Sequence, residues 1–157
     1  MIILGIDPGY ATVGYGIIET DGMRFRTVDY GAVTTPANTS FDIRLEMIYD
    51  GICELCGRYK PDAASVEELF FNTNITTGIA VGHSRGVILL ALRKSGVDFY
   101  EYTPLQVKQS VVGYGRAEKK QVMIMTKTLL GLERMPRPDD AADALALAVC
   151  HAHCAKS

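Results

Sequence analysis

The chain has 157 residues, of which 48% are hydrophobic and 22% charged, and its formal net charge is −2 at pH 7. This length and balance predict a single globular domain over residues 1–157, because no Gly-, Pro- or Ser-rich linker divides the chain. Met1 leads directly into an apolar run with no basic region or cleavage site, and no apolar stretch looks long enough to span a bilayer. We therefore expect a cytoplasmic protein with no membrane partner.

The first predicted elements are three β-strands. Ile2–Ile6 is a short apolar run that stops at the turn residues Asp7-Pro8-Gly9. Val13–Glu19 is rich in β-forming residues and is joined to Phe25–Val33 through Asp21-Gly22, a strong hairpin dipeptide. The second and third strands are therefore expected to pair as a hairpin.

The rest of the chain alternates helices and strands and then ends in helices. The predicted elements are a helix after Ser40 that ends near Tyr59, a strand at Ala64–Leu69, a helix at Thr76–Lys94, a strand at Val97–Tyr102, and helices at Pro104–Val112, Glu118–Leu130 and Pro138–His153. A hairpin followed by right-handed crossovers predicts an α/β fold with a five-stranded mixed sheet flanked by helices. The first and fourth strands should lie side by side at its centre.

Four cysteines allow two interpretations. Cys53 and Cys56 could form a zinc site together with Cys150 and Cys154. We favour reduced, mostly buried thiols on two helices, because Cys56 falls on an apolar stripe with helical spacing. The tight Gly- or Pro-containing knuckle that usually presents a zinc-binding pair is also missing from the sequence around Cys53 and Cys56.

Carboxylates occur where a packed interior is expected. Asp7 ends the first strand, Glu67 lies within a buried strand, and Asp140 and Asp143 lie three residues apart in a helix of alanine and leucine. Asp140 could simply complement the helix N-terminus, but a buried ionised carboxylate costs several kcal/mol unless it is paired or binds a cation. Oxygen ligands favour Mg²⁺ or Mn²⁺ over zinc. Two such ions roughly 4 Å apart support phosphodiester hydrolysis.

The small net charge hides a segregation along the chain. Residues 85–127 carry eight basic and three acidic residues, a net charge of +5, whereas the remainder carries −7. Charged runs often just solvate a helix face, but a basic segment in an acidic frame also fits a surface that meets phosphate.

The motifs, taken in order, resemble one family. They are Gly5-Ile6-Asp7-Pro8-Gly9, Gly14-Tyr15-Gly16, Val66-Glu67-Glu68-Leu69-Phe70, Gln106-Val107-Lys108-Gln109, Val112-Gly113-Tyr114-Gly115, Ala117-Glu118-Lys119 and Asp140-Ala141-Ala142-Asp143-Ala144-Leu145-Ala146. The ordered set, from about residue 2 to residue 153, resembles the RuvC family of crossover junction endodeoxyribonucleases. Each motif alone has little specificity, whereas the set in this order is highly specific.

This resemblance implies a ribonuclease-H-like fold and Mg²⁺-dependent, symmetric nicking of Holliday junctions by a homodimer that works beside a branch-migration motor. It also implies two metal ions per active site, with Mn²⁺ as a substitute for Mg²⁺. The family's catalytic and metal-binding acids fall on Asp7, Glu67, Asp140 and Asp143, and its supporting lysines fall on Lys108 and Lys119.

DNA contacts are expected around these residues. Phe70 matches the family's aromatic residue at the junction centre, although either Phe70 or the adjacent Phe71 could be core instead. Arg85, Arg116 and Lys120 are further expected DNA contacts, with a plain surface role as the alternative for Arg85.

Three alternative functions remain to be weighed. Asp7-Pro8-Gly9 also resembles the phosphate loop of actin-like ATPases, but this chain lacks a second copy of the loop. A related nuclease that acts on RNA precursors is a nearer alternative. A non-catalytic junction-binding module is the third, and the complete acidic set argues against it, because carboxylates opposite phosphate would weaken binding.

Overall fold

The computed structural model describes residues 1–68 and 75–155. The elements in chain order are β1 (Ile2–Asp7), β2 (Thr12–Thr20), β3 (Phe25–Thr34), α1 (Phe41–Tyr59), β4 (Ala63–Glu67), α2 (Ile75–Lys94), β5 (Phe99–Tyr102), α3 (Pro104–Val111), α4 (Lys119–Leu129) and α5 (Asp139–Cys154). Their order is the predicted one. The predicted fourth strand was too long, because β4 ends at Glu67, and Leu69 lies outside the described residues.

The strands form one mixed sheet in the order β3-β2-β1-β4-β5. β1 pairs antiparallel with β2, and β2 antiparallel with β3, as expected for a hairpin meander. β4 runs parallel to both β1 and β5, because α1 and α2 carry the chain back between these strands. The predicted pairing of the first and fourth strands at the sheet centre is therefore confirmed.

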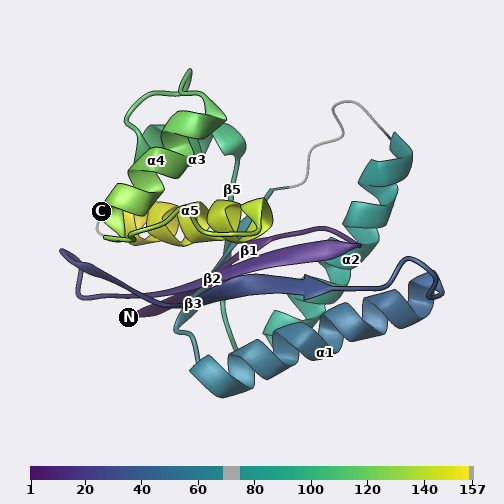
Figure 1. Ribbon diagram of the computed structural model, residues 1–157. Coiled ribbons are helices and arrows are strands. Elements are labelled where there is room, and N and C mark those ends of the chain that lie inside the picture. The colour runs from purple at the N-terminus through teal and green to yellow at the C-terminus, as the bar shows by residue number, and fades with distance from the viewer. Residues whose placement is uncertain (69–74, 156–157) are drawn as a thin grey trace.

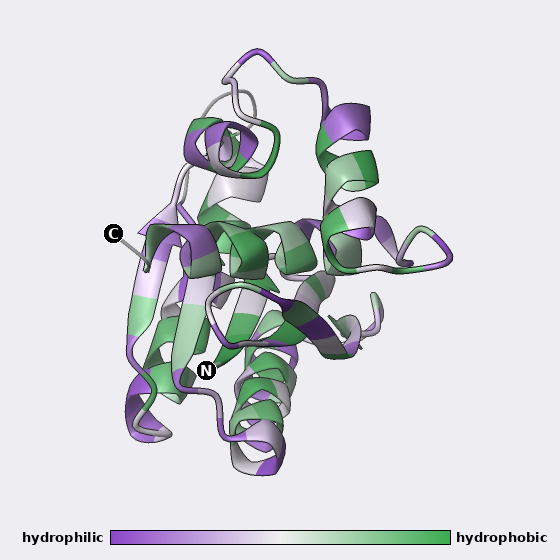
Figure 2. Ribbon diagram, turned by 90° about the vertical axis from the view of Figure 1, so that its left-hand side faces the viewer, coloured by the Kyte–Doolittle hydropathy of each residue, from purple (hydrophilic) through white to green (hydrophobic). Residues whose placement is uncertain are grey.

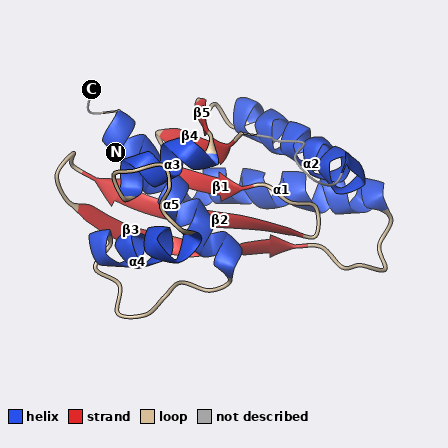
Figure 3. Cartoon of the chain, turned by 90° about the horizontal axis from the view of Figure 1, so that it is seen from above, coloured by secondary structure: helices blue, strands red, loops and turns tan. Residues whose placement is uncertain are grey.

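Helices cover both faces of the sheet. α5 lies across one face, chiefly over β1 and β2, while α1 and α2 pack together on the opposite side (Figures 1 and 3). α3 and α4 pack on the outer side of α5 rather than on the sheet. α5 is consequently enclosed on two sides, and in Figure 2 the hydrophobic colour is concentrated between the layers. Eleven of its sixteen residues are buried.

The alternation of side chains in β1 assigns each residue to one of these layers. Leu4 and Ile6 belong to the core under α1 and α2, whereas Ile3 belongs to the core under α5. Successive side chains of a strand point to opposite faces. Gly5 and Asp7 therefore share the α5 face with Ile3.

Glycines allow α5 to approach the sheet closely. A Cβ atom at Gly5 would lie 1.9 Å from the main-chain oxygen of Ala144, and one at Gly14 would lie 2.1 Å from that of Asp140. Only a residue without a side chain can occupy such positions. A side-chain hydrogen bond also joins β4 to α5: the Ser65 hydroxyl donates a 2.6 Å hydrogen bond to the main-chain oxygen of Leu147.

α2 is the most apolar helix on the outside of the fold. Judged by length and composition alone, it is the one helix within the described residues that is able to cross a membrane, which corrects the expectation that no such stretch exists. Mostly buried core helices of globular proteins meet the same criterion, whereas 22% of the α2 window is buried, and α2 packs along α1. Its exposed side chains include Ile75, Ile79 and Leu90.

Candidate active site

Two of the predicted acids meet at one edge of the sheet. β1 and β4 are parallel, with Ile6 opposite Val66, so the next residues, Asp7 and Glu67, end neighbouring strands at the same edge. Carboxyl ends of parallel strands are where ligands bind in open α/β sheets. Glu67 is half-buried and hydrogen-bonded to Asp7, whereas Glu68 is exposed. The geometry therefore selects Glu67 of the two adjacent glutamates.

The other two acids come from the first turns of α5. Spacing of three residues puts Asp140 and Asp143 on one face of the helix, and the contact with Gly14 and Gly5 turns that face toward the end of β1. One carboxylate oxygen from each of Asp7, Asp140 and Asp143 lies within 4.8 Å of the others. The neighbouring Asp139 is exposed. Four predicted acids from three distant segments thus come together.

The cluster is electrostatically strained in the absence of a cation. Burial, followed by the nearby charges of Glu67, Asp143 and Asp140, raises the pKa of Asp7 from 3.8 to about 9. Burial also raises the pKa of Glu67 and of Asp143; a hydrogen bond from Asp7 opposes the rise at Glu67, and chiefly Lys119, followed by Asp7, opposes it at Asp143. Asp7 is therefore the carboxyl of this cluster that is protonated when no cation is bound.

The donor set fits a hard divalent cation. Oxygens on opposite sides of one Mg²⁺ are about 4.2 Å apart, given Mg–O distances of 2.0–2.1 Å, and the three carboxylate oxygens, which lie within 4.8 Å of one another, are near enough to share one ion after small side-chain movements. A bound cation would replace the proton on Asp7 and remove the repulsion that raises its pKa. Within the part of the chain that the structure describes, no other trio of His, Cys, Asp or Glu is grouped closely enough to hold a metal.

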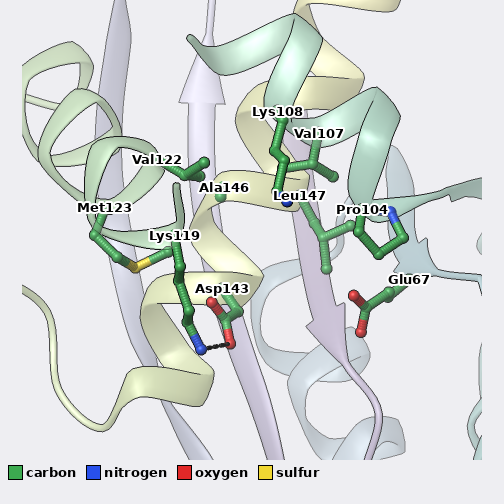
Figure 4. Close-up of a pocket in the computed structure, with 10 residues that line it drawn as sticks. All are labelled: Glu67, Pro104, Val107, Lys108, Lys119, Val122, Met123, Asp143, Ala146 and Leu147. Carbon is green, nitrogen blue, oxygen red and sulfur yellow. Dashed lines mark hydrogen bonds and ion pairs between the residues drawn. The ribbon is translucent and has the colours of Figure 1, made fainter. Parts of the chain in front are cut away.

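Two predicted lysines line a cavity beside the acids. The cavity has a volume of about 240 Å³, and its lining includes Glu67, Asp143, Lys108 and Lys119. Lys119 points to Asp143, whereas Lys108 lies on another side of the cavity, beside Val107 and Leu147 (Figure 4). The Lys119 Nζ atom is 3.4 Å from an Asp143 carboxylate oxygen, and the attraction of Asp143 raises the pKa of this lysine. Both lysines thus line the same cavity as Glu67 and Asp143, and Lys119 is in contact with Asp143.

Local sequence at α3 and α4 sets the positions of these lysines. Thr103 and Gln106 form a capping box that starts α3 at Pro104, so Lys108 follows one turn later on the same face. At α4 the Gln121 side chain accepts a 2.8 Å hydrogen bond from the main-chain N–H of Glu118. This fixes Lys119 as the first helical residue.

The remaining predicted DNA contacts have different surroundings. Arg116 and Lys120 are exposed, in the loop before α4 and in its first turn. Phe70 and Phe71 lie outside the described residues. Arg85 is directed into the protein: its guanidinium contacts the main-chain oxygen of Glu67 and the side chain of Glu101. A phosphate contact at Arg85 stays a prediction, and in this structure its guanidinium faces Glu67 and Glu101.

Sequence reasoning missed the apolar part of the cavity and the glycine surface. Beyond the charged residues, the cavity is lined by Pro104, Val107, Val122, Met123, Ala146 and Leu147. The paired glycines of Gly14-Tyr15-Gly16 were a visible signal for close packing, but nothing in the sequence indicated that α5 would be the neighbour. The four cysteines lie on α1 and α5 and form no disulfide with one another, with Cys56 and Cys150 buried and Cys154 exposed.

The family model described as crossover junction endodeoxyribonuclease RuvC matches residues 3–151. The chain belongs to the RuvC family. Curated relatives named crossover junction endodeoxyribonuclease RuvC support this over nearly the whole length. The Alkaliphilus metalliredigens protein is 60% identical over 153 residues, covering 98% of this chain and 93% of the relative. The Ruminiclostridium cellulolyticum protein is 58% identical over 151 residues, covering 96% and 91%.

Solved RuvC structures share the fold described above. Thermus thermophilus RuvC has a TM-score of 0.93 and 36% identity, covering 99% of this chain and 96% of its own. The same protein in complex with a Holliday junction substrate has a TM-score of 0.95 and 37% identity, covering 99% and 95%. The predicted family and the predicted ribonuclease-H-like fold are both confirmed.

Proposed function

We propose that this protein cuts four-way DNA junctions by metal-dependent, symmetric nicking during recombination and repair. The observation that carries the proposal is the convergence of Asp7, Asp140 and Asp143 within 4.8 Å, with Glu67 hydrogen-bonded to Asp7. A protein that only binds DNA would lose affinity by keeping these carboxylates beside phosphate. The match to RuvC bound to a Holliday junction substrate supports the junction as the target.

The four acids would hold two Mg²⁺ ions, or Mn²⁺ in their place. Bound there, the ions supply a water of lowered pKa and stabilise the leaving oxygen. The protein's own residues prepare this chemistry: Asp7 gives up its proton to become a ligand, and the close contact of α5 holds Asp140 and Asp143 facing β1. Lys108 and Lys119, which line the same cavity as Glu67 and Asp143, would stabilise the negative charge that develops on the scissile phosphate.

A cleavage assay with four substrates tests this function. The purified protein is incubated with a synthetic four-way junction, a linear duplex, a single strand and a folded RNA, each with Mg²⁺ and with a chelator. We expect paired nicks in the junction only, and only with Mg²⁺. Cleavage of the RNA in preference to the junction would favour the alternative of a nuclease for RNA precursors. Binding without cleavage would favour a non-catalytic module.

The proposed enzyme acts as a homodimer, because a four-way junction has two-fold symmetry and needs two nicks on opposing strands. α2 offers a surface for a second copy. A shallow apolar groove follows its outer side, lined by Ile79, Gly82, His83, Gly86, Val87 and Leu90. Gly82 and Gly86 are four residues apart, so they lie on one face and would let two helices approach closely.

Sedimentation of the free protein tests this surface. Leu90→Glu places a charge on an apolar side chain that is 50% exposed, so the variant should sediment as a monomer and make single rather than paired nicks. A dimeric Leu90→Glu variant would show that another face is used. The motor partner and the cytoplasmic location stay predictions.

A further inference from the structure

Two consecutive residues of α2 hold the backbone at the ends of the strands that carry Asp7 and Glu67. The Ser84 hydroxyl, which is fully buried, donates a hydrogen bond to the main-chain oxygen of Gly9, two residues after Asp7. The Arg85 Nε atom donates a 3.2 Å hydrogen bond to the main-chain oxygen of Glu67 itself. α2 therefore contacts the chain immediately beside both strand-borne acids.

Arg85 also reaches the next strand. One of its terminal nitrogens lies 2.6 Å from a Glu101 carboxylate oxygen, and Glu101 in β5 is paired with Val66, the residue before Glu67. The Arg85 side chain is only 13% exposed. The contact with Glu101 is a close ion pair rather than an aligned hydrogen bond, since this buried nitrogen makes no hydrogen bond among the described residues. A DNA phosphate could reach it only if this arrangement opened.

We propose that Arg85 is a positioning residue for Glu67, and that Glu101 holds Arg85 in place. This inference rests on the proposed use of Glu67 as a cation ligand. A ligand carboxylate must be held to within roughly 0.5 Å to be effective, and residues that orient metal ligands typically change metal affinity 10- to 100-fold when removed. The Arg85 contact is to the backbone of Glu67, so it fixes the strand end and leaves both carboxylate oxygens available.

The need for arginine follows from the two acceptors. They belong to different strands, one a main-chain oxygen in β4 and the other a carboxylate in β5. A planar guanidinium presents several N–H groups in a fixed fork, whereas a lysine ammonium offers a single point charge. Asp140 and Asp143 are held separately, by the contact of α5 with Gly5 and Gly14. Loss of Arg85 should therefore displace Glu67 and leave the α5 acids in position.

Paired variants of both partners test the inference. Arg85→Gln, Arg85→Lys and Glu101→Gln are compared with the wild type and with Arg58→Gln, which removes an exposed arginine from α1. Mn²⁺ binding is titrated on the DNA-free protein, and junction binding is measured with a chelator at several salt concentrations. The Mg²⁺ concentration for half-maximal cleavage is then determined. Thermal melting confirms that each variant is folded.

We expect Arg85→Gln and Glu101→Gln to weaken Mn²⁺ binding roughly 10- to 100-fold and to raise the Mg²⁺ requirement for cleavage. Junction affinity and its salt dependence should be unchanged, and Arg85→Lys should recover part of the Mn²⁺ affinity. Glu101→Gln is decisive, because removing an acid beside a phosphate-binding arginine would tighten junction binding instead.

Unchanged Mn²⁺ affinity in Glu101→Gln would overturn the inference. So would a fall in junction affinity in Arg85→Gln with a salt slope reduced by about one, which marks a phosphate contact. If Arg85→Gln does not fold, Glu101→Gln alone decides, since its side chain is 39% exposed. A wild type that binds Mn²⁺ but cuts no junction would reject the proposed function while leaving this inference to be judged by Mn²⁺ binding.

Discussion

On one face of the sheet α5 packs against glycines, whereas on the other face α1 and α2 pack through isoleucine and leucine side chains. Gly5, Gly14 and Gly16 bring strand backbone within contact of the α5 backbone. Opposite them, Leu4 and Ile6 meet large side chains such as Ile48 and Ile52. The layers on the two sides of the same strands therefore lie at different distances from them.

This difference in packing gives the two faces of the sheet different roles: the α5 face carries the acidic cluster, and the α1 and α2 face supports it. Short acidic side chains on α5 can reach Asp7 only because the helix backbone lies so close to β1. The α1 and α2 side carries no such constraint, and it supplies a large hydrophobic core together with the contacts of Ser84 and Arg85. Substitutions on the α5 face should therefore change catalysis, and those within α1 should change only stability.

The largest expected effect is that of Asp143→Asn. This substitution keeps the shape of the side chain and removes a charge that the metal ions need, so cleavage should be lost while junction binding persists. A gel-shift assay beside a nicking assay measures both. Asp50→Asn, an exposed position on α1, is the matched control and should behave as wild type. Near-normal cleavage by Asp143→Asn would remove this residue from the site.

A smaller effect is expected when the cations of the cavity are removed. Lys108→Ala and Lys119→Ala should each slow single-turnover cleavage at saturating enzyme by roughly a hundredfold, because the lysines act on charge that develops in the transition state. Arg58→Ala, on α1, should leave the rate unchanged. If either lysine variant only weakens junction binding, that lysine is a DNA-positioning contact instead.

A direct test of the packing difference compares two glycines. A Cβ at Gly5 would lie 1.9 Å from a main-chain oxygen of α5, whereas one at Gly57 in α1 meets nothing within 4 Å. Gly5→Ala should lower the free energy of unfolding by about 1–3 kcal/mol, and the displaced helix should slow cleavage. Gly57→Ala should raise this free energy by about 0.5–1 kcal/mol through helix propensity. Urea unfolding measures both, and equal effects would contradict the comparison.

The last expected effect, which does not involve catalysis, is a pH dependence of stability in the metal-free protein. The pKa of Asp7 is about 9 in the folded state and 3.8 ordinarily. The folded state therefore binds this proton more tightly than the unfolded state, so its stability falls as pH rises from about 4 toward 9. Between pH 5 and pH 9 we expect the melting temperature to drop by about 10 °C or more.

Melting curves with a chelator and with Mg²⁺ check this expectation. Mg²⁺ should oppose the fall, and increasingly so at high pH, because binding requires the deprotonated carboxylate. Asp7→Asn should reduce the pH dependence, although Glu67 and Asp143, whose pKa values are also raised, should retain part of it. Asp50→Asn should retain all of it. A pH dependence that is the same in Asp7→Asn and in wild type would place the proton elsewhere.

Much of the site could be predicted from the sequence because its residues violate ordinary burial patterns. Asp7 follows four apolar residues, and Asp143 lies among alanines and leucines, so each was conspicuous without any structure. The ordered motifs then supplied the family. The surroundings of Arg85 could not be predicted in this way, because an arginine in a helix has no sequence pattern that distinguishes an exposed charge from one that is paired inside the protein.

By itself the sequence determined the elements, their order and the identity of the acids. These follow from local periodicity, turn residues and the alternation that places Gly5 and Asp7 on one face of β1. Only the tertiary structure decided that α5 would cover that face and that Arg85 would donate a hydrogen bond to the main-chain oxygen of Glu67 at the end of β4. Both arrangements depend on contacts between residues far apart in the chain, such as Gly5 with Ala144. The distance between the two backbones sets these contacts, and local residue patterns do not encode that distance.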